Sequence, residues 1–444
     1  MENRLLTEKI PKLYMIYVIP AIAAMVLDGI QGIIDGLFLG NFVGANAMAS
    51  VNIANPYFQI IIGSTMIICT GTMSAAGRAL GARDFSRAKN IYRSALIVLL
   101  FISVVILACG VLFPKPIARF LGADDLLLDN SVKYIRTLAL FVPIISLKIL
   151  FGFSGRLIDK PHLYLAGTIT TVSANIILDF IAVKILQLGV VGAASATGLA
   201  YLAGLFIVSP PFFMKKTVLN LFEGRFCARE ILMAAFNGSS EGVTYAANAL
   251  TVFLLNRSFM NFAGAGGVAA FTVISYAGNF VTLIMFGMSD GISPILSNNY
   301  GAGQKHRIQS TLRIALAANF LIGVLLFIIF NLFGENLIRI FVDNAEDASI
   351  IQMAADGAKI YGICFLANGF NIVQSGYHTA LGNAVASITI AASRGIVFIV
   401  IGIALFSALW GINGVWFTLP FAELMTVLCC LIISQKQRVP LAKL

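Results

Sequence analysis

Charged side chains are scarce in this sequence. Only 11% of the 444 residues are Asp, Glu, Lys or Arg, whereas 59% are hydrophobic, and the mean hydropathy is +0.91. This composition lies far outside the range of soluble globular proteins. Because one spanning helix uses roughly 20 to 25 residues, twelve such helices would leave no room for a sizeable soluble domain. The apolar runs are too continuous for the alternating strands of an outer-membrane barrel, so we expect an all-α polytopic membrane protein.

The sequence also lacks the motifs of several other classes of protein. Its six cysteines and three histidines show no pairing pattern and no metal-ligand spacing. No glycine-rich phosphate loop followed by Lys-Ser or Lys-Thr occurs, which argues against ATP as the direct driver. The net charge of +10 is spread over short segments between apolar runs, which argues against nucleic acid as a partner. We therefore expect neither enzymatic activity nor a cofactor.

Twelve apolar runs are long enough to span a bilayer. They cover about 13–39, 46–74, 91–113, 131–153, 162–183, 189–213, 230–257, 266–292, 310–333, 352–376, 384–406 and 412–434. Twenty of the thirty Lys and Arg residues fall on the side that carries both termini, whereas the opposite loops contain acidic groups, namely Asp124, Asp125, Asp129, Asp343, Glu346 and Asp347. The positive-inside rule therefore predicts that both termini are cytoplasmic.

The two halves of the sequence repeat each other at an offset of 220 residues. Residues 41–45 (NFVGA) recur as 261–265 (NFAGA), Gly81 matches Gly301, and Arg87 matches Arg307. An even number of helices in each repeat makes the halves parallel, related by a pseudo-two-fold axis along the membrane normal, as in transporters. The sequence thus predicts an N-lobe of helices 1–6 (residues 1–213), a cytoplasmic linker (214–229) and a C-lobe of helices 7–12 (230–444).

Carboxylates inside the predicted spans point to a site in the N-lobe. An ionised group near the bilayer centre costs about 2.5 to 3.5 kcal/mol on insertion scales, so each one suggests a function. Asp35 and Asp179 lie at similar depths, Asn175 is one turn from Asp179, and Thr197 enters from the same surface. Two carboxylates, an amide and a hydroxyl suit a proton or a hard cation such as Na⁺. The alternative is that each acid pairs with a base or caps a broken helix.

Glu241 lies near the membrane midplane of the predicted seventh helix. A desolvated carboxylate with aromatic neighbours attracts large organic cations. We therefore expect a substrate-binding group made of Glu241, Asp28, Tyr57, Tyr245, Phe38 and Phe280. Structural packing is the alternative for the aromatic residues, and a solvated interfacial carboxylate is the alternative for Asp290. Arg394 is expected to be a structural partner of helix-terminal carbonyls or of an acid.

The sequence resembles the multidrug and toxic compound extrusion (MATE) family, in its bacterial form. The resemblance rests on the twelve-helix repeat and on segments 34–40 (IDGLFLG), 175–179 (NIILD), 80–82 (LGA) and 299–302 (NYGA). It implies an antiporter that exports organic, often cationic and amphipathic compounds in exchange for H⁺ or Na⁺. It also implies a cation-coupling site at Asp35, Asn175, Asp179 and Thr197, which would be the metal ligands if Na⁺ is the coupling ion. Some branches of the family carry an acid in helix 10, where this sequence has Asn368 and Asn371.

A cation-coupled exporter is therefore the favoured interpretation, acting as a monomer in the bacterial inner (cell) membrane on small organic cations. The alternative is a flippase for a lipid or lipid-linked precursor, which the same fold can support. A cavity lined by several bases would favour the flippase, because its cargo is a phosphate anion. The intramembrane charge in this sequence is mainly acidic, which favours a cationic cargo.

Overall fold

The computed structural model describes residues 4–339 and 348–438, and these ranges are mainly helical, without strands. The first half contains α1 (Arg4–Thr7), α2 (Ile10–Phe42), α3 (Ala45–Gly81), α4 (Phe85–Leu112), α5 (Pro114–Phe120), α6 (Leu128–Ala139), α7 (Val142–Gly155), α8 (His162–Asp179), the π-helix η1 (Phe180–Ile185), α9 (Gly189–Val208) and the 3₁₀-helix η2 (Pro210–Phe213). The second half contains α10 (Ala228–Gly301), α11 (Lys305–Arg339), α12 (Ala348–Gly362), α13 (Cys364–Leu381), α14 (Ala384–Ala392), the π-helix η4 (Ser393–Val397), α15 (Phe398–Trp410) and α16 (Ile412–Arg438). The predicted external acids Asp343, Glu346 and Asp347 lie outside the described residues.

The described helices make up the twelve predicted spans. Nine of them are long and apolar enough to cross a membrane, and the bent pair α6–α7 provides a tenth. Helix α10, at 74 residues, would be about 110 Å long if it were straight, but Gly264 has non-helical backbone angles (φ 60°, ψ −153°) and divides it into two spans. The consecutive helices α12 and α13 together form the remaining span. The twelve-helix prediction is confirmed.

The fourth span differs from its expected form. The sequence predicts one helix over about 131–153, whereas the structure has α6 and α7 bent by 51°. Pro143 lies in the first turn of α7. A proline has no N–H to donate, and its ring clashes with the carbonyl four residues earlier, here that of Ala139, where α6 ends.

The backbone follows the 220-residue repeat. The equivalent glycines Gly44 and Gly264 both have positive φ, and so do the equivalent residues Arg83 and Gly303. A methyl group built on Gly81 would lie 1.9 Å from the carbonyl oxygen of Asn298, and one built on Gly301 would lie 1.9 Å from that of Arg78. Since Asn298 is residue 78 plus 220, the two contacts are related by the repeat. This reciprocity confirms the pseudo-two-fold axis between an N-lobe (α2–α9) and a C-lobe (α10–α16).

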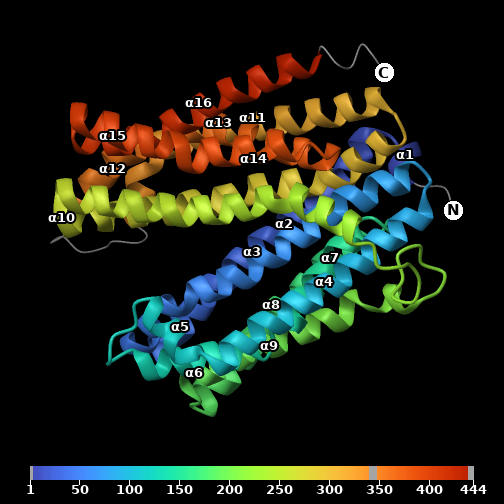
Figure 1. The fold of residues 1–444 in the computed structure, drawn as a ribbon. Helices are drawn as coiled ribbons and strands as arrows, with labels where there is room; N and C mark the ends of the chain where they lie inside the picture. The colour runs from blue at the N-terminus through green and yellow to red at the C-terminus, as the bar shows by residue number, and fades with distance from the viewer. Residues whose placement is uncertain (1–3, 340–347, 439–444) are drawn as a thin grey trace.

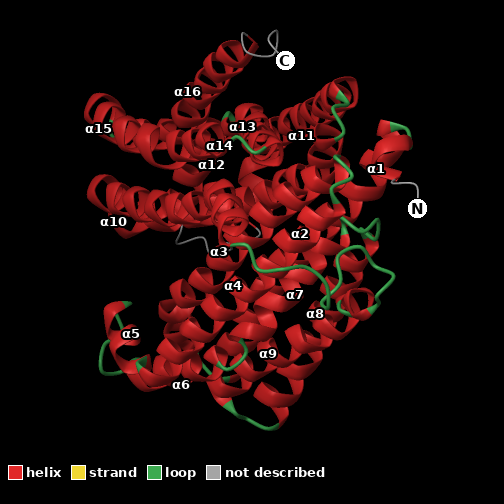
Figure 2. Ribbon diagram, turned by 45° about the vertical axis from the view of Figure 1, so that its right-hand side comes forward, coloured by secondary structure: helices red, strands yellow, loops and turns green. Residues whose placement is uncertain are grey.

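The two lobes meet at the end where α3 and α10 cross, which we name the closed end. Figure 1 shows the ribbons of the lobes converging there, near the start of α1, and diverging toward the opposite end; Figure 2 shows the same arrangement from another direction. Close backbone contacts across the lobes also involve Gly71 with Ala234 and Gly291 with Val18. The lack of side chains on these glycines lets the helices touch.

The short helix α1 is inserted at the closed end. The side chain of Leu5 is fully buried. Arg307 of the C-lobe donates hydrogen bonds to the carbonyls of Leu5 (3.1 Å) and Glu8 (2.7 Å). Arg4 lies 3.7 Å from the carboxylate of Asp159 in the N-lobe. The N-terminal segment therefore contacts both lobes.

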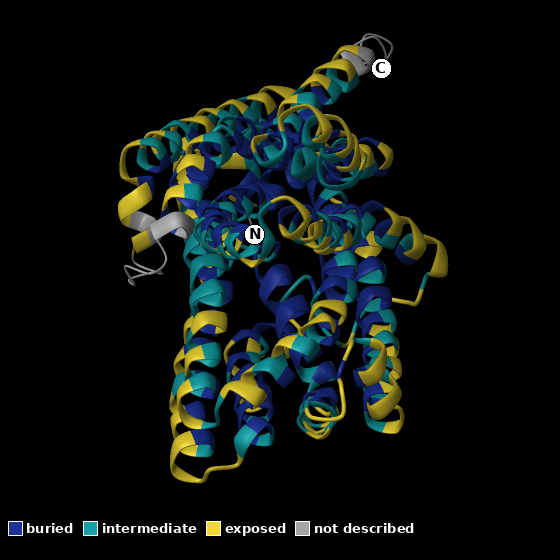
Figure 3. Ribbon diagram, turned by 90° about the vertical axis from the view of Figure 1, so that its left-hand side faces the viewer, coloured by how far each residue is buried: buried dark blue, intermediate teal, exposed yellow. Residues whose placement is uncertain are grey.

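Buried residues face the interior of each lobe, whereas exposed residues lie on the outer faces of the helices (Figure 3). These outer faces carry large apolar side chains, such as Phe101 (68% exposed) and Leu321 (69% exposed). In water, such a surface would be unfavourable, but in a bilayer it contacts lipid tails. The helices are therefore arranged as expected for a multi-pass membrane protein.

The segment between the lobes, residues 214–227, is held against α4 by hydrogen bonds and an ion pair. Arg93 donates to the carbonyl of Leu221 (2.5 Å), and the backbone N–H of Cys227 donates to the hydroxyl of Ser94 (2.8 Å). Lys89 forms an ion pair with Glu223. The hydrogen bond from Lys89 holds the pKa of the Glu223 carboxyl below its usual range. These contacts belong to the N-lobe alone.

Candidate functional site

The structure brings the predicted N-lobe acids together. Helix α2 carries Asp35, and α8 carries Asn175 and Asp179 one turn apart, which are 0% and 1% exposed. The carboxyl groups of Asp35 and Asp179 lie close enough to interact directly. Thr197, on the adjacent helix α9, is 8% exposed. Its hydroxyl donates to the carbonyl of Ala193 (3.0 Å) and keeps its oxygen lone pairs available.

Five polar atoms of this group lack hydrogen-bond partners in the described part of the chain. They are one oxygen of Asp35, both oxygens of Asp179, and the oxygen and nitrogen of the Asn175 amide, all buried. A buried polar group left without a partner costs about 1 to 3 kcal/mol, more if it is charged. Two ionised carboxylates at such close range also repel each other. The arrangement therefore fits a proton shared by the acids, or a cation held by their oxygens.

The helix that carries Asp179 changes its winding directly after that residue. The π-helix η1 begins at Phe180 and continues to Ile185. A π segment inside an α-helix is rare and is often found at a functional site. Tyr134 of α6 lies within electrostatic range of both Asp35 and Asp179. This tyrosine could not be selected from the sequence, because its proximity depends on how α6 packs against the acids.

A second acidic group lies between the lobes. Tyr245 of α10 is within electrostatic range of Glu241, Asp290 and Asp28. Its ring also contacts Gly63 of α3, with a closest separation of 3.8 Å from a methyl group built there. Of the predicted substrate-binding residues, Glu241, Asp28 and Tyr245 are thus brought together by the fold.

Two buried bases offset part of this negative charge. Lys148 is 2% exposed, lies within range of Asp28, and is 5.2 Å from the ring centre of Tyr201. Arg156 is 1% exposed and donates to the backbone carbonyl of Asp290 (3.2 Å). Its guanidinium also lies over the ring of Tyr164, at 4.3 Å. Asp28 and Asp290 therefore lie near buried bases, and Glu241 lies within electrostatic range of Arg394; within the described ranges none of the three acids forms an ion pair.

The other predicted aromatic residues, Tyr57, Phe38 and Phe280, lie on α3, α2 and α10. Tyr57 is 4% exposed in the packed interior of the N-lobe, and its hydroxyl donates to the carbonyl of Ile106 (2.9 Å). The ring of Phe38 lies 5.7 Å from that of Phe42, on the same helix. Phe280 is half-buried on α10. The structure gives Tyr57 the contacts of a core residue, because its hydroxyl joins α3 to α4.

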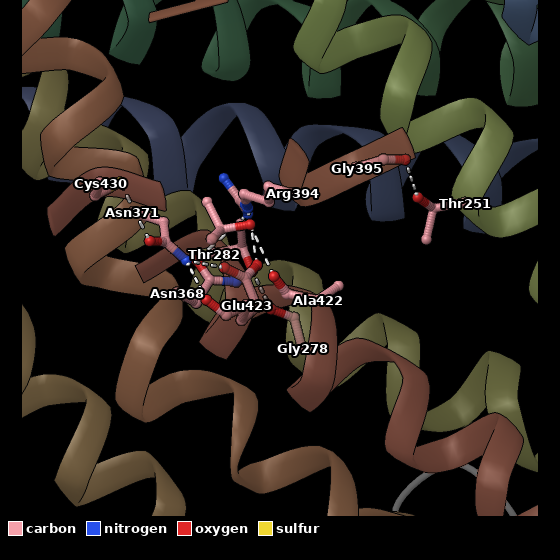
Figure 4. A network of polar contacts seen from close by, with 11 residues as sticks. Thr251, Gly278, Thr282, Asn368, Asn371, Arg394, Gly395, Ala422, Glu423 and Cys430 are labelled. Carbon is pink, nitrogen blue, oxygen red and sulfur yellow. Dashed lines mark hydrogen bonds and ion pairs between the residues drawn. The ribbon is translucent and has the colours of Figure 1, made fainter. Parts of the chain in front are cut away.

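One charged group in the C-lobe is absent from the sequence expectations. Glu423 of α16 is 6% exposed and accepts a hydrogen bond from Arg394 at 2.8 Å. Asn371 donates to the carboxylate of Glu423 at 2.7 Å, and Figure 4 shows these side chains converging from three helices. Arg394, expected to be a structural partner of helix-terminal carbonyls or of an acid, forms an ion pair with this acid. Glu423 carried the same sequence signal as Asp35, a carboxylate within an apolar run.

These features define a polytopic membrane transporter made of two related six-helix lobes. The model of the MatE family matches residues 20–181 and 242–405, so the chain belongs to the MatE family.

Similar proteins and structures cover nearly the whole chain. The chain is 25% identical to the multidrug export protein MepA of Staphylococcus aureus over 96% of its length and 94% of that protein. It is 24% identical to MepA of Staphylococcus saprophyticus, over 94% of this chain and 92% of the relative. An outward-facing multidrug resistance MATE transporter of the MOP superfamily has a TM-score of 0.91 at 22% identity, covering 99% of this chain and 98% of its own. A mutant of the Vibrio cholerae MATE transporter VcmN has a TM-score of 0.89 at 20% identity, and the match covers 96% of this chain and 97% of that transporter.

Proposed function

We propose that this protein is a cation-coupled antiporter that exports organic, cationic and amphipathic compounds in exchange for H⁺ or Na⁺. The observation that carries the proposal is the group of Asp35, Asn175 and Asp179, in which five buried polar atoms have no partner in the described part of the chain. The relatives' description as multidrug export proteins supports the direction and the kind of cargo.

Coupling follows from the charge of the two acids. Desolvation and like-charge repulsion disfavour two ionised carboxylates side by side, so binding of a proton or Na⁺ stabilises the pair. Binding from the outer side removes net negative charge and changes the packing of α2, α8 and α9, which favours release of a cationic cargo. Release of the ion toward the cytoplasm restores the negative charge and readiness for cargo. In the Na⁺ case, Asp35, Asn175, Asp179 and Thr197 supply the oxygens.

The ion gradient is strong enough to drive this cycle. Each proton that enters supplies about 2.3 kcal/mol per 100 mV of membrane potential and about 1.4 kcal/mol per pH unit. A monovalent cationic cargo leaves against the same potential, so one-for-one exchange gains about 1.4 kcal/mol per pH unit, which matches one tenfold cargo gradient, and each further proton adds the potential term as well.

Glu241 is proposed as the main cargo contact, with Tyr245 beside it. Because Arg394, the base within electrostatic range of Glu241, is already paired with Glu423, Glu241 is the acid of this group with the least compensated charge. The buried bases have acidic or aromatic neighbours, which supports a cationic cargo over the phosphate cargo of a lipid flippase.

The membrane orientation forms part of the proposal. We place both termini and the 214–229 linker in the cytoplasm, with lobes 1–213 and 230–444 in a bacterial cell membrane and the protein acting as a monomer. The excess of Lys and Arg on that side supports this orientation. The closed end then faces the cytoplasm.

Transport of ethidium, a monocationic dye, into inside-out membrane vesicles tests the function. Vesicles with the wild-type protein should accumulate ethidium when a pH gradient or a Na⁺ gradient is imposed, and the two gradients should be tested separately. Vesicles with the Asp35→Asn protein provide the matched control. Equal accumulation with no gradient, or preferential transport of an anionic dye, would contradict the proposal.

A further inference from the structure

The ion pair between Glu423 and Arg394 fixes the position of a cation beside the proposed cargo path. The side chains of Arg394 and Glu423 are 16% and 7% exposed, and the guanidinium Nε lies 2.8 Å from one carboxylate oxygen. The other oxygen accepts a hydrogen bond from Asn371 (2.7 Å), which also donates to the backbone carbonyl of Glu423 (2.8 Å). Asn371 is itself fully buried. The carboxylate is therefore held in place from two sides (Figure 4).

Arg394 lies on a segment that contacts the helix of Glu241. It belongs to the π-helix η4, whose Gly395 carbonyl accepts a hydrogen bond from Thr251 of α10 (2.9 Å). A methyl group built on Gly395 would lie 2.4 Å from the side chain of Ala247, fewer than two turns from Glu241. Glu241 is within electrostatic range of Arg394, although no ion pair joins them. The guanidinium thus has a second acid nearby.

The fold does not require this ion pair. In the N-lobe, the helices α8 and α9 occupy the corresponding places, and α9 contains no charged residue. These two helices nevertheless pack closely, because a methyl group built on Gly167 would meet Val208 at 2.4 Å. The pair between η4 and α16 therefore has a purpose other than holding two neighbouring helices together.

The net charge of Glu241, Arg394 and Glu423 indicates what the ion pair does. When all three are ionised, Glu241, Arg394 and Glu423 carry −1, +1 and −1, so the group has a net charge of −1. If Glu423 were neutral, Arg394 would lose its charged partner. Its 3.4 Å hydrogen bond to the amide oxygen of Asn368 is weak, so the nearby carboxylate of Glu241 would be the strongest acceptor. Glu241 would then be neutralised by a cation of the protein itself.

We propose that Glu423 is a positioning residue that holds Arg394 away from Glu241, so that one negative charge of the C-lobe stays available to a cationic cargo. This inference rests on the proposed function, because it assigns cargo binding to Glu241. Glu423 itself need not touch the cargo. Its carboxylate thereby determines whether the pathway selects cations.

Binding of ethidium to the purified full-length protein in lipid nanodiscs tests the proposal. Glu423→Gln should weaken binding about tenfold, the effect of neutralising one nearby charge in a partly desolvated site. The double variant Glu423→Gln/Arg394→Gln should recover affinity, because Glu241 is then unpaired and the net charge is again −1. Glu423→Asp should retain affinity. Glu335→Gln, which disrupts an exposed Glu–Arg ion pair at 2.7 Å, is the matched control and should bind normally.

A second readout follows Glu241 without any cargo. Dicyclohexylcarbodiimide modifies protonated carboxyl groups in membrane proteins, and the extent at Glu241 can be measured by mass spectrometry. Pairing with Arg394 keeps Glu241 ionised, so Glu423→Gln should reduce its modification and the double variant should restore it. Unchanged modification of Glu241 in Glu423→Gln, or a double variant that is as impaired as the single one in both assays, would overturn the proposal. If the wild type fails to bind ethidium while the modification pattern is as expected, the cargo assignment is wrong and the positioning role stands.

Discussion

Replacing Gly301 with alanine should open the closed end of the molecule. The added methyl carbon would lie 1.9 Å from the carbonyl oxygen of Arg78, in the other lobe. Ordinary close C···O contacts are about 3.3 Å, so the two helices must separate by about 1.4 Å. The obstacle is a backbone atom, which cannot rotate away, so the strain falls on the contact between the lobes.

The expected size of the effect follows from that strain. Overpacking by one methyl group costs about 1 to 3 kcal/mol. The contact exists only while this end is closed. The overpacking cost therefore shifts the equilibrium between the closed and open states toward the open state, by about 5- to 150-fold. The fold of each lobe should be unaffected, because the clash lies between the lobes. Gly81→Ala should behave in the same way, since its methyl group would meet the carbonyl of Asn298 at 1.9 Å.

Spin labels on the two lobes can measure the opening. Ser86 and His306 are exposed, repeat-equivalent positions beside the closed end. Both positions are changed to cysteine and spin-labelled in a protein without its native cysteines. In double electron–electron resonance, Gly301→Ala should add a component at longer distance between the two labels. Gly32→Ala is the control, because a methyl group there meets nothing within 4 Å. Identical distance distributions in the wild type and in a folded, monodisperse Gly301→Ala protein would refute the reasoning.

Three further predictions concern coupling, topology and the N-terminal segment. Asp35→Asn and Asp179→Asn each mimic a permanently protonated acid, so both proteins should fold but lose gradient-driven ethidium transport in vesicles; wild-type transport by both would exclude the coupling role. With the other cysteines removed, Cys227 should react with a membrane-impermeant maleimide only after cells are permeabilised, and labelling of intact cells would reverse the topology. Arg307→Ala removes two charge-assisted hydrogen bonds of about 1.5 to 3 kcal/mol each, so amide hydrogen exchange in α1 should rise about tenfold or more by mass spectrometry. Unchanged exchange would show that α1 is held by other contacts.

The sequence by itself determined the class of protein, the helices and the repeat. Hydropathy decides which segments cross a bilayer, because each segment must satisfy its backbone hydrogen bonds internally and exposes its side chains to lipid. These are local properties, so runs of apolar residues are sufficient to predict them. The offset of 220 residues likewise predicted the pseudo-two-fold axis, which Gly81 and Gly301 obey in their contacts. The high cost of a charge in lipid singled out Asp35, Asp179 and Glu241 for the same reason.

Only the tertiary structure decided which of these charges have partners. Glu423 and Arg394 are 29 residues apart and on different helices, so their ion pair depends on how α16 packs against η4. The same holds for Asp35 and Asp179, whose proximity depends on the packing of α2 against α8. Tyr57 was predicted near the cargo, yet its hydroxyl bonds to α4, because the direction of an aromatic side chain depends on its neighbours. Charge and hydropathy are carried by single residues, whereas pairing and burial are properties of several helices together. This is why the sequence indicated a shared site for Asp35 and Asp179 but not the pairing of Arg394 with Glu423.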